Sequence, residues 1–154
     1  MISKLNCTEI EIAVARHINP RINLIVPNVF WGFGLNYEAD LVVVTPTGYA
    51  WEIEIKTTVS DLKADQKKRY QHNSNKFKRL YFAVPYSMKE ISLELIPERS
   101  GLLVVNYDYR VLLVKAPTSN RYAHKLTLDE VEKLKDLAAM RIWSLKEHIL
   151  RLKK

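Results

Sequence analysis

Apolar positions recur with the period of a helix in four segments of the chain. Between Thr8 and Ile18 they fall every three or four residues, which puts Ile10 and Val14 on one buried stripe. Thr8 is expected to cap this helix, and Glu11 three residues later completes the pattern of a capping box. The same spacing predicts helices over residues 58–70, 87–96 and 127–152.

The last predicted helix is long and amphipathic. Thr127 and Glu130 form a second capping-box pattern ahead of it, and Ser60 is the expected cap of the helix over residues 58–70. The apolar stripe of the last helix predicts packing onto a sheet, and a homodimer contact through that helix is the alternative. The stripe consists of Val131, Leu134, Ala138, Leu145, Ile149 and Leu152.

Shorter apolar runs, closed by turn residues, predict the strands. Pro27 makes the first of them an edge strand or an interrupted one. Together with the helices they give the order α-β-β-β-α-β-α-β-β-α, which predicts a single α/β domain over residues 1–154 with a mixed sheet flanked by helices. The strands are expected over residues 23–31, 40–44, 49–56 and 79–85, and as a hairpin within residues 101–117 that turns near Asn106.

Charged residues alternate with apolar ones on the strand over residues 49–56. Glu52, Glu54 and Lys56 therefore share one face, with Lys56 about 7 Å beyond Glu54. Taken alone, this E-x-K pattern is most simply a solvated face with weak ion pairs. The alternative is a site in which the carboxylates hold a metal ion and the lysine contacts a phosphate or an attacking water.

An acid on the preceding strand favours the second interpretation. If the turn over residues 46–48 pairs Thr45 with Tyr49, Asp40 lies opposite Glu54, whereas a slip of one residue would separate them. Two carboxylates placed side by side repel each other. A divalent cation such as Mg²⁺ removes that conflict, since it is commonly held by one or two carboxylates and phosphate oxygens.

Composition narrows the class of protein. No stretch approaches about 18 uncharged apolar residues, so no membrane span is expected. The N-terminus lacks the features of a secretory signal. Cys7 is the only cysteine of the 154 residues, which excludes an internal disulfide and a multi-cysteine zinc site. These features predict a cytoplasmic protein.

The formal net charge of +7 favours polyanionic partners such as nucleic acid. Basic residues are concentrated between positions 63 and 79, where Asp65 is the one acid. Such a run is usually a solvated face, and it gains significance from the carboxylates upstream. The residues expected to contact DNA phosphates are Lys63, Lys67, Lys68, Arg69 and Lys76.

The order of these motifs resembles the MmcB-like DNA repair proteins, within the PD-(D/E)xK nuclease superfamily. In that family an E-x-K strand leads into a D-[FL]-x-x-D-x-K helix, then a strand of the form FYFAVP, then I-P-x-x-x-G-L. One departure is that Lys67 is followed by Lys68 where the family usually has Trp. The resemblance covers about residues 8–117 and leaves out the C-terminal helix. It rests on the segments "EADLVVV", "WEIEIKTTVSDLKADQK", "RLYFAVP", "LELIPERSGLLVVN" and "VLLVKAP".

The resemblance implies a restriction-endonuclease-like core and a metal-dependent active site. Asp40 and Glu54 would hold Mg²⁺ or Mn²⁺, and the backbone carbonyl of Ile55 would complete the site. Lys56 would orient or help deprotonate the attacking water and stabilise charge on the scissile phosphate. Glu9, from the first helix, would be a further carboxylate at the site.

Three assignments stay open. Glu11 rivals Glu9 because the phase of the helix does not separate them, although Glu11 also fits a capping role. Glu38 competes with Asp40 as a ligand. Aromatic residues of the glycine-containing loop either stack on bases or belong to the core, which is the commoner role. These aromatic residues are Trp31, Phe33 and Tyr37.

The implied function is a metal-dependent DNA endonuclease in repair or recombination. Three alternatives compete with it: a catalytically inactive DNA-binding module with the same fold, a junction-resolving nuclease dimer, and a scaffold whose basic face binds an acidic protein. Metal uptake, mass in solution and salt-dependent DNA binding separate these four.

Overall fold

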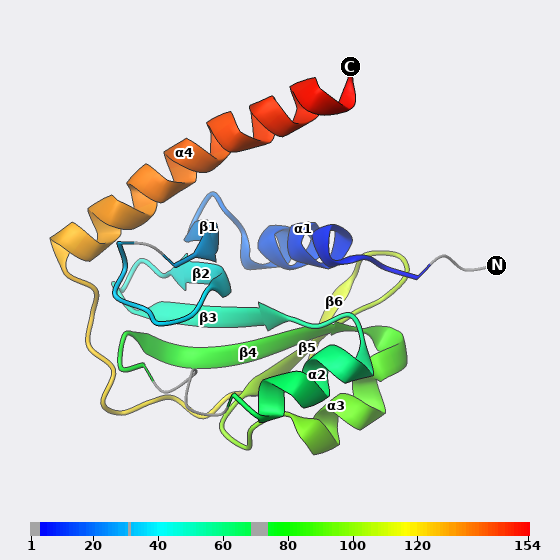
Figure 1. Cartoon of the computed structure of the whole chain (residues 1–154). Helices are drawn as coiled ribbons and strands as arrows, with labels where there is room; N and C mark the ends of the chain where they lie inside the picture. The colour runs from blue at the N-terminus through cyan, green and yellow to red at the C-terminus, as the bar shows by residue number, and fades with distance from the viewer. Residues whose placement is uncertain (1–3, 31, 69–73) are drawn as a thin grey trace.

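The structure is a computed structural model, and it describes residues 4–30, 32–68 and 74–154 (Figure 1). The helices and strands in these ranges follow the order that the hydrophobic pattern predicts. The helices are α1 (Cys7–Ile18), α2 (Val59–Gln66), α3 (Lys89–Leu95), preceded by a 3₁₀ turn at Tyr86–Met88, and α4 (Leu128–Leu152). The strands are β1 (Leu24–Val29), β2 (Ala39–Val44), β3 (Ala50–Ile55), β4 (Phe77–Pro85), β5 (Gly101–Val105) and β6 (Val111–Lys115).

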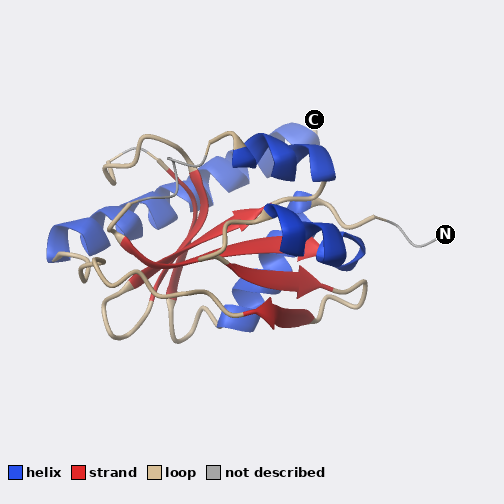
Figure 2. Cartoon of the chain, turned by 90° about the horizontal axis from the view of Figure 1, so that it is seen from below, coloured by secondary structure: helices blue, strands red, loops and turns tan. Residues whose placement is uncertain are grey.

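The strands form one mixed sheet in the order β1-β2-β3-β4-β5-β6. β1, β2 and β3 are antiparallel neighbours, as are β5 and β6, whereas β4 is parallel to both β3 and β5. α2 and α3 make the two crossovers that these parallel pairs require. Helices lie on both sides of the sheet, and its strands fan out through the sheet's twist (Figure 2). The mixed sheet with flanking helices is therefore confirmed, and β1, which carries Pro27, is an edge strand.

Each face of the sheet has its own apolar core. Because side chains alternate along a strand, Leu41 and Val43 of β2 face α1, whereas Val42 and Val44 face the opposite side. On that opposite side one cluster lies between the sheet and α4, and a second lies between the sheet and the crossover helices α2 and α3. In Figure 1, α2 and α3 lie side by side, and they contact each other.

The charged face of β3 lies between these two clusters. Ala50 belongs to the α4 cluster, and Leu80 and Phe82, the β4 partners of Glu52 and Glu54, belong to the α2–α3 cluster. As a result Glu52 is fully buried and Glu54 is 4% exposed. The interpretation of this strand as a solvated face is wrong.

The expected helix caps differ at two of three sites. α1 begins at Cys7, so Asn6 is its cap and forms the capping box with Glu9, whereas Thr8 and Glu11 were expected. α2 is capped by the hydroxyl of Thr58, two residues before the expected Ser60. The capping box of Thr127 and Glu130 at the start of α4 is confirmed.

Packing of α4 onto the sheet is confirmed for its first half and is wrong for its second. Leu134 and Leu137 are buried against β1 and its neighbours, and Arg141 donates a hydrogen bond to the carbonyl of Asn28. Beyond Arg141 every residue of the helix is exposed, and Figure 1 shows this end of α4 standing clear of the sheet. No helix in the described ranges combines the length and hydrophobicity needed to cross a bilayer.

Candidate active site

The β2–β3 hairpin brings Asp40 and Glu54 together. The amide of Thr45 donates to the carbonyl of Tyr49 at 2.9 Å, and the same register pairs Leu41 with Ile53. Continuing that register places Asp40 opposite Glu54, as the turn predicted, and the two carboxyl groups share a hydrogen bond.

Asp40 is fixed by the backbone of β3. Its Oδ2 accepts a hydrogen bond from the amide of Ile55 at 2.7 Å. Burial raises the pKa of Asp40, and this hydrogen bond, the Lys56 ammonium and the hydrogen bond with Glu54 offset that rise only in part. Asp40 therefore holds a proton more tightly than an ordinary aspartate does, and a cation bound beside it would replace that proton.

Lys56 is held between two buried carboxylates. Its Nζ lies 3.5 Å from Glu54 Oε2 and 3.3 Å from Asp65 Oδ1, and its side chain is 16% exposed. Its own amide donates to the carbonyl of Ala83 on β4 at 3.0 Å. Burial acts to lower the pKa of Lys56, but Glu54, Asp65 and Asp40 together raise it above the usual value, so the side chain is an ammonium at neutral pH.

Asp65 completes this arrangement, although sequence reasoning gave it no part in the site. It is 8% exposed on α2 and reaches Lys56 from the face of the sheet that carries Glu54. The available signal in the sequence was a single acid inside a basic segment. Its burial in the structure agrees with pairing, because aspartate is rarely buried unless it is paired.

The carboxylates of α1 are arranged differently from the expectation. Glu9 accepts a hydrogen bond from the amide of Asn6 at 2.8 Å as part of the capping box, and the hydroxyl of Tyr109 lies 3.3 Å from its other oxygen. The pKa of Glu11 is raised, first by burial and then by the charge of Asp40. Glu9 thus serves the capping box, Glu11 is the α1 carboxylate whose pKa the charge of Asp40 raises, and a role of either residue in the site stays a prediction.

The charged groups of this site also affect the pKa of the Cys7 thiol. Burial raises the pKa of Cys7, and Asp40, Glu11 and Asp61 raise it further, while Lys56 opposes them. Among the described residues, no group of three or more His, Cys, Asp or Glu side chains is arranged to hold a metal ion.

The other residues considered for the site serve the fold. The hydroxyl of Tyr37 donates to Glu52 at 2.9 Å, and burial and this carboxylate raise the pKa of Tyr37. Phe33 is 2% exposed, so both aromatics belong to the core, and Trp31 lies outside the described residues. Glu38 accepts a hydrogen bond from Asn28, which leaves Asp40 as the acid opposite Glu54.

The basic residues divide into exposed and structural ones. Lys63, Lys67 and Lys68 are exposed on α2 and just after it. Lys76 instead forms an ion pair with Glu130 of α4 and lies 5.0 Å from the ring centroid of Phe33. Lys76 is therefore removed from the expected DNA contacts, and Arg69 lies outside the described residues.

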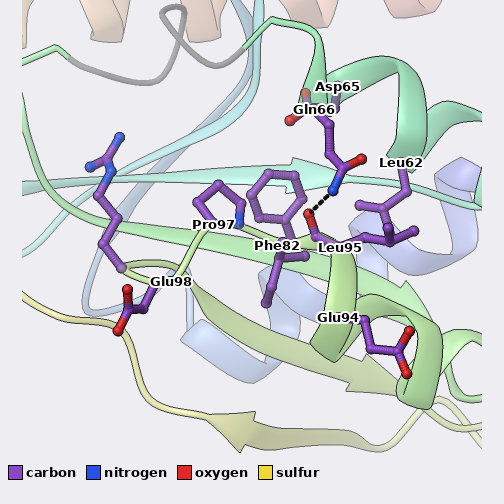
Figure 3. A pocket seen from close by; sticks show the side chains of 10 residues that line it. Leu62, Asp65, Gln66, Phe82, Glu94, Leu95, Pro97 and Glu98 are labelled. Carbon is purple, nitrogen blue, oxygen red and sulfur yellow. Dashed lines mark hydrogen bonds between the residues drawn. The ribbon is translucent and has the colours of Figure 1, made fainter.

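A pocket of about 400 Å³ adjoins the site behind Asp65 (Figure 3). The side chain of Gln66 closes one side by donating to the carbonyl of Leu95 at 2.9 Å. Phe82 and Pro97 form apolar walls, and the carboxylates of Glu94 and Glu98 lie at its edge (Figure 3). Arg99 also lines the pocket, so its wall carries charges of both signs.

The fold and site define an α/β protein whose mixed sheet carries a carboxylate pair and a buried lysine at the junction of its antiparallel and parallel halves. The family model for the DNA repair protein MmcB-like family matches residues 8–148, and the chain belongs to that family. The match extends through most of α4, which corrects the narrower resemblance over residues 8–117. Membership points to a role in DNA repair and to DNA as a partner.

A solved structure, the SPO1766 protein of unknown function from Silicibacter pomeroyi, is similar to this chain with a TM-score of 0.65 and 25% sequence identity. The similarity covers 97% of this chain and 94% of that one. No curated protein matches the chain.

Proposed function

We propose that the chain is a metal-dependent DNA nuclease of the PD-(D/E)xK type that acts in repair. The observation that carries the proposal is the juxtaposition of the buried carboxyl group of Glu54, the partly buried one of Asp40 and the partly buried ammonium of Lys56, in a basic member of a DNA repair family. Perturbed ionisable groups gathered in one place are typical of active sites.

The donor set suits a hard divalent cation. Asp40 and Glu54 would hold Mg²⁺ or Mn²⁺, which are commonly bound by one or two carboxylates together with substrate phosphate oxygens. The carbonyl of Ile55 would be the third protein ligand, since its peptide neighbours both acids. When bound, the ion supplies Lewis acidity at the phosphate and lowers the pKa of a water molecule.

Lys56 would stabilise negative charge and would not serve as a proton acceptor. Because its pKa is raised, it remains an ammonium and stabilises negative charge that develops on the scissile phosphate. Asp65 would act as a positioning residue, since its carboxylate and that of Glu54 both hold the Lys56 Nζ. Lys63, Lys67 and Lys68 would bind the DNA backbone without reading its sequence.

Nicking of supercoiled plasmid tests the proposal. Wild-type protein is expected to nick in Mn²⁺ or Mg²⁺ and to stop when EDTA removes the ion. Lys56→Ala should lose at least about 100-fold in rate, the scale of a lost electrostatic contact to the reacting group. Lys135→Ala, which removes an exposed lysine of α4, is the matched control and should nick like the wild type.

Other results would select the competing functions. Equal nicking by wild-type protein and Lys56→Ala would assign the activity to a contaminant or to a different site. Salt-dependent DNA binding without nicking or metal uptake would define a catalytically inactive DNA-binding module. Nicking confined to branched DNA, by a particle of twice the 18.0 kDa chain mass, would define a junction-resolving dimer.

A further inference from the structure

The second half of α4 is a preformed helix with an apolar face that the fold leaves uncovered. Leu134 and Leu137 anchor the first half, and Arg141 makes the last contact with the body through the carbonyl of Asn28. From residue 142 onward every side chain is exposed, among them Ile142 at 55% and Leu145 at 59%. Figure 1 shows this segment extending past the sheet to the C-terminus.

Four of the six large apolar side chains from residue 142 onward follow a heptad spacing, and Trp143 and Leu150 lie outside it. Ile142, Leu145, Ile149 and Leu152 are separated by three, four and three residues, which places them on one seam. Isoleucine then occupies both a positions and leucine both d positions, the combination that favours two-stranded packing. We call these four residues the α4 seam. Their pattern predicts pairing with one further amphipathic helix.

The charges beside the seam determine which helix that is. Arg141 and His148 occupy the g positions, and Lys146 and Lys153 occupy the e positions. In a parallel pair of identical helices, g residues face e residues, so Arg141 of one copy would meet Lys146 of the other. In an antiparallel pair e faces e and g faces g, with the same result. Self-pairing through the α4 seam is therefore opposed by repulsion in either orientation.

No acid of this chain relieves that repulsion at the seam. Glu147 is the one acidic residue between positions 141 and 154, and it lies at the outer f position, with its carboxylate 3.8 Å from Arg151. The seam itself presents four aliphatic side chains, which make no hydrogen bonds to phosphates and gain most from an apolar partner. The combination of an aliphatic centre and a basic border matches an amphipathic helix bordered by carboxylates.

We propose that the α4 seam is a docking site for an acidic amphipathic helix of another protein. Basic e and g positions would select that partner through opposite charges and would exclude a second copy of this chain. The proposal is independent of the nuclease site, because none of the residues proposed to bind the metal ion or to act on the phosphate lies on α4.

Calorimetric titration with two synthetic peptides tests the docking site. Both peptides carry three heptads with Ile at a and Leu at d; one has Glu at e and g, and the control has Lys there. The full-length protein is expected to bind the Glu peptide at least about tenfold more tightly than the Lys peptide, and added salt should narrow the difference. Equal binding of both peptides, or binding of neither, overturns the proposal.

A matched pair of variants locates the binding on the helix. Ile149 and Leu150 are adjacent and both exposed, at 43% and 59%, so an aspartate at either leaves the core intact. Ile149→Asp should weaken binding of the Glu peptide by about tenfold or more, whereas Leu150→Asp, outside the seam, should leave it nearly unchanged. Equal effects of the two variants would contradict the assignment to the seam.

The state of the free protein separates the acidic partner from a second copy. Sedimentation should give a wild-type monomer of 18.0 kDa, and Lys146→Glu combined with Lys153→Glu should create a dimer, because Glu would then face Arg141 and His148 of the other chain. A wild-type dimer that Ile149→Asp dissociates would overturn the proposal. The proposal would also be overturned if the Glu peptide did not bind and Ile149→Asp weakened DNA binding more than Leu150→Asp did.

Discussion

Asp40, Glu54 and Lys56 are ionisable side chains that the fold brings together, Glu54 buried and the other two partly buried. The Ile55 amide fixes Asp40, and Asp65 and Glu54 fix the Lys56 ammonium. The burial of Asp40 raises its pKa, so its charged form costs free energy that an exposed aspartate would not. Such a cost is typical of sites where function opposes stability.

Removing the charge of Asp40 should therefore stabilise the protein. Asp40→Asn keeps an oxygen to accept from Ile55 and adds a donor toward Glu54, and it should raise the free energy of unfolding by about 1 kcal/mol at neutral pH. Because the folded pKa of Asp40 is raised, this gain is complete above that pKa. It should fade as the pH falls toward the ordinary aspartate value, below which Asp40 is protonated in both states.

Urea unfolding at several pH values measures this effect. The control is Glu132→Gln, which neutralises an exposed acid of α4. A destabilised Asp40→Asn at neutral pH, with the control unchanged, would show that the Asp40 charge is satisfied in the fold.

Cys7 offers an independent view of the same charges. Burial and the neighbouring carboxylates raise the pKa of its thiol, so its reaction with a disulfide reagent at neutral pH should be slow. A cation bound at Asp40 and Glu54 would offset the charge of Asp40 and lower that pKa. Mg²⁺ should therefore speed the reaction several-fold.

Because Cys7 is the sole cysteine, the absorbance change of the reagent reports this thiol alone. Glu54→Gln, which removes one proposed ligand, should abolish the acceleration by Mg²⁺. Acceleration that persists in this variant would place the ion elsewhere.

Among the elements, the β2–β3 hairpin was predictable in detail and α1 was not. The turn after Thr45 sets the register of the hairpin locally, so the pairing of Asp40 with Glu54 followed from the sequence. In α1 the buried stripe of Ile10 and Val14 was predictable, whereas the cap was not. The cap is Asn6, two residues before the expected Thr8, so the capping box includes Glu9 and not Glu11.

The role of Lys76 could not be predicted from the sequence near it, because it depends on a residue far away in the chain. Its partner, Glu130, lies 54 residues away and belongs to the capping box of α4. Although burial would raise the pKa of Glu130, hydrogen bonds from Lys76 and Thr127 hold it below the usual value. A basic residue in a basic run cannot be separated from its neighbours until the path of α4 is known.

Lys76 and Lys67 should accordingly give opposite phenotypes. Lys76→Ala leaves Glu130 partly buried without its ion pair, and it should lower the free energy of unfolding by about 1–2 kcal/mol with little effect on DNA affinity. Lys67→Ala should leave stability unchanged, weaken DNA binding, and reduce the slope of log affinity against log salt by about 1.

Thermal unfolding and fluorescence anisotropy with duplex DNA measure the two effects. Lys63→Ala serves as a second exposed control and should behave like Lys67→Ala. A strong loss of DNA affinity in Lys76→Ala, with its stability intact, would return Lys76 to the DNA contacts.

At the scale of the whole molecule, the proposed nuclease site and the exposed end of α4 are two separate surfaces. The net charge of +7 attracts DNA to the protein, while the buried acids of β3 concentrate negative charge at one point of the sheet. A divalent cation reconciles the two, because it allows an anionic phosphate to approach anionic side chains. The exposed end of α4 stands apart from this site and presents a separate surface.

Uptake of Mn²⁺, measured by calorimetric titration, tests most directly whether Asp40 and Glu54 share one divalent ion. The wild type should bind one ion, and its affinity should fall as the pH drops from neutral, because protons compete at the raised pKa of Asp40. Asp40→Asn and Glu54→Gln should each lower the affinity by about tenfold or more, whereas Glu132→Gln should not. No uptake by the wild type, or uptake that survives loss of both acids, would contradict the shared site.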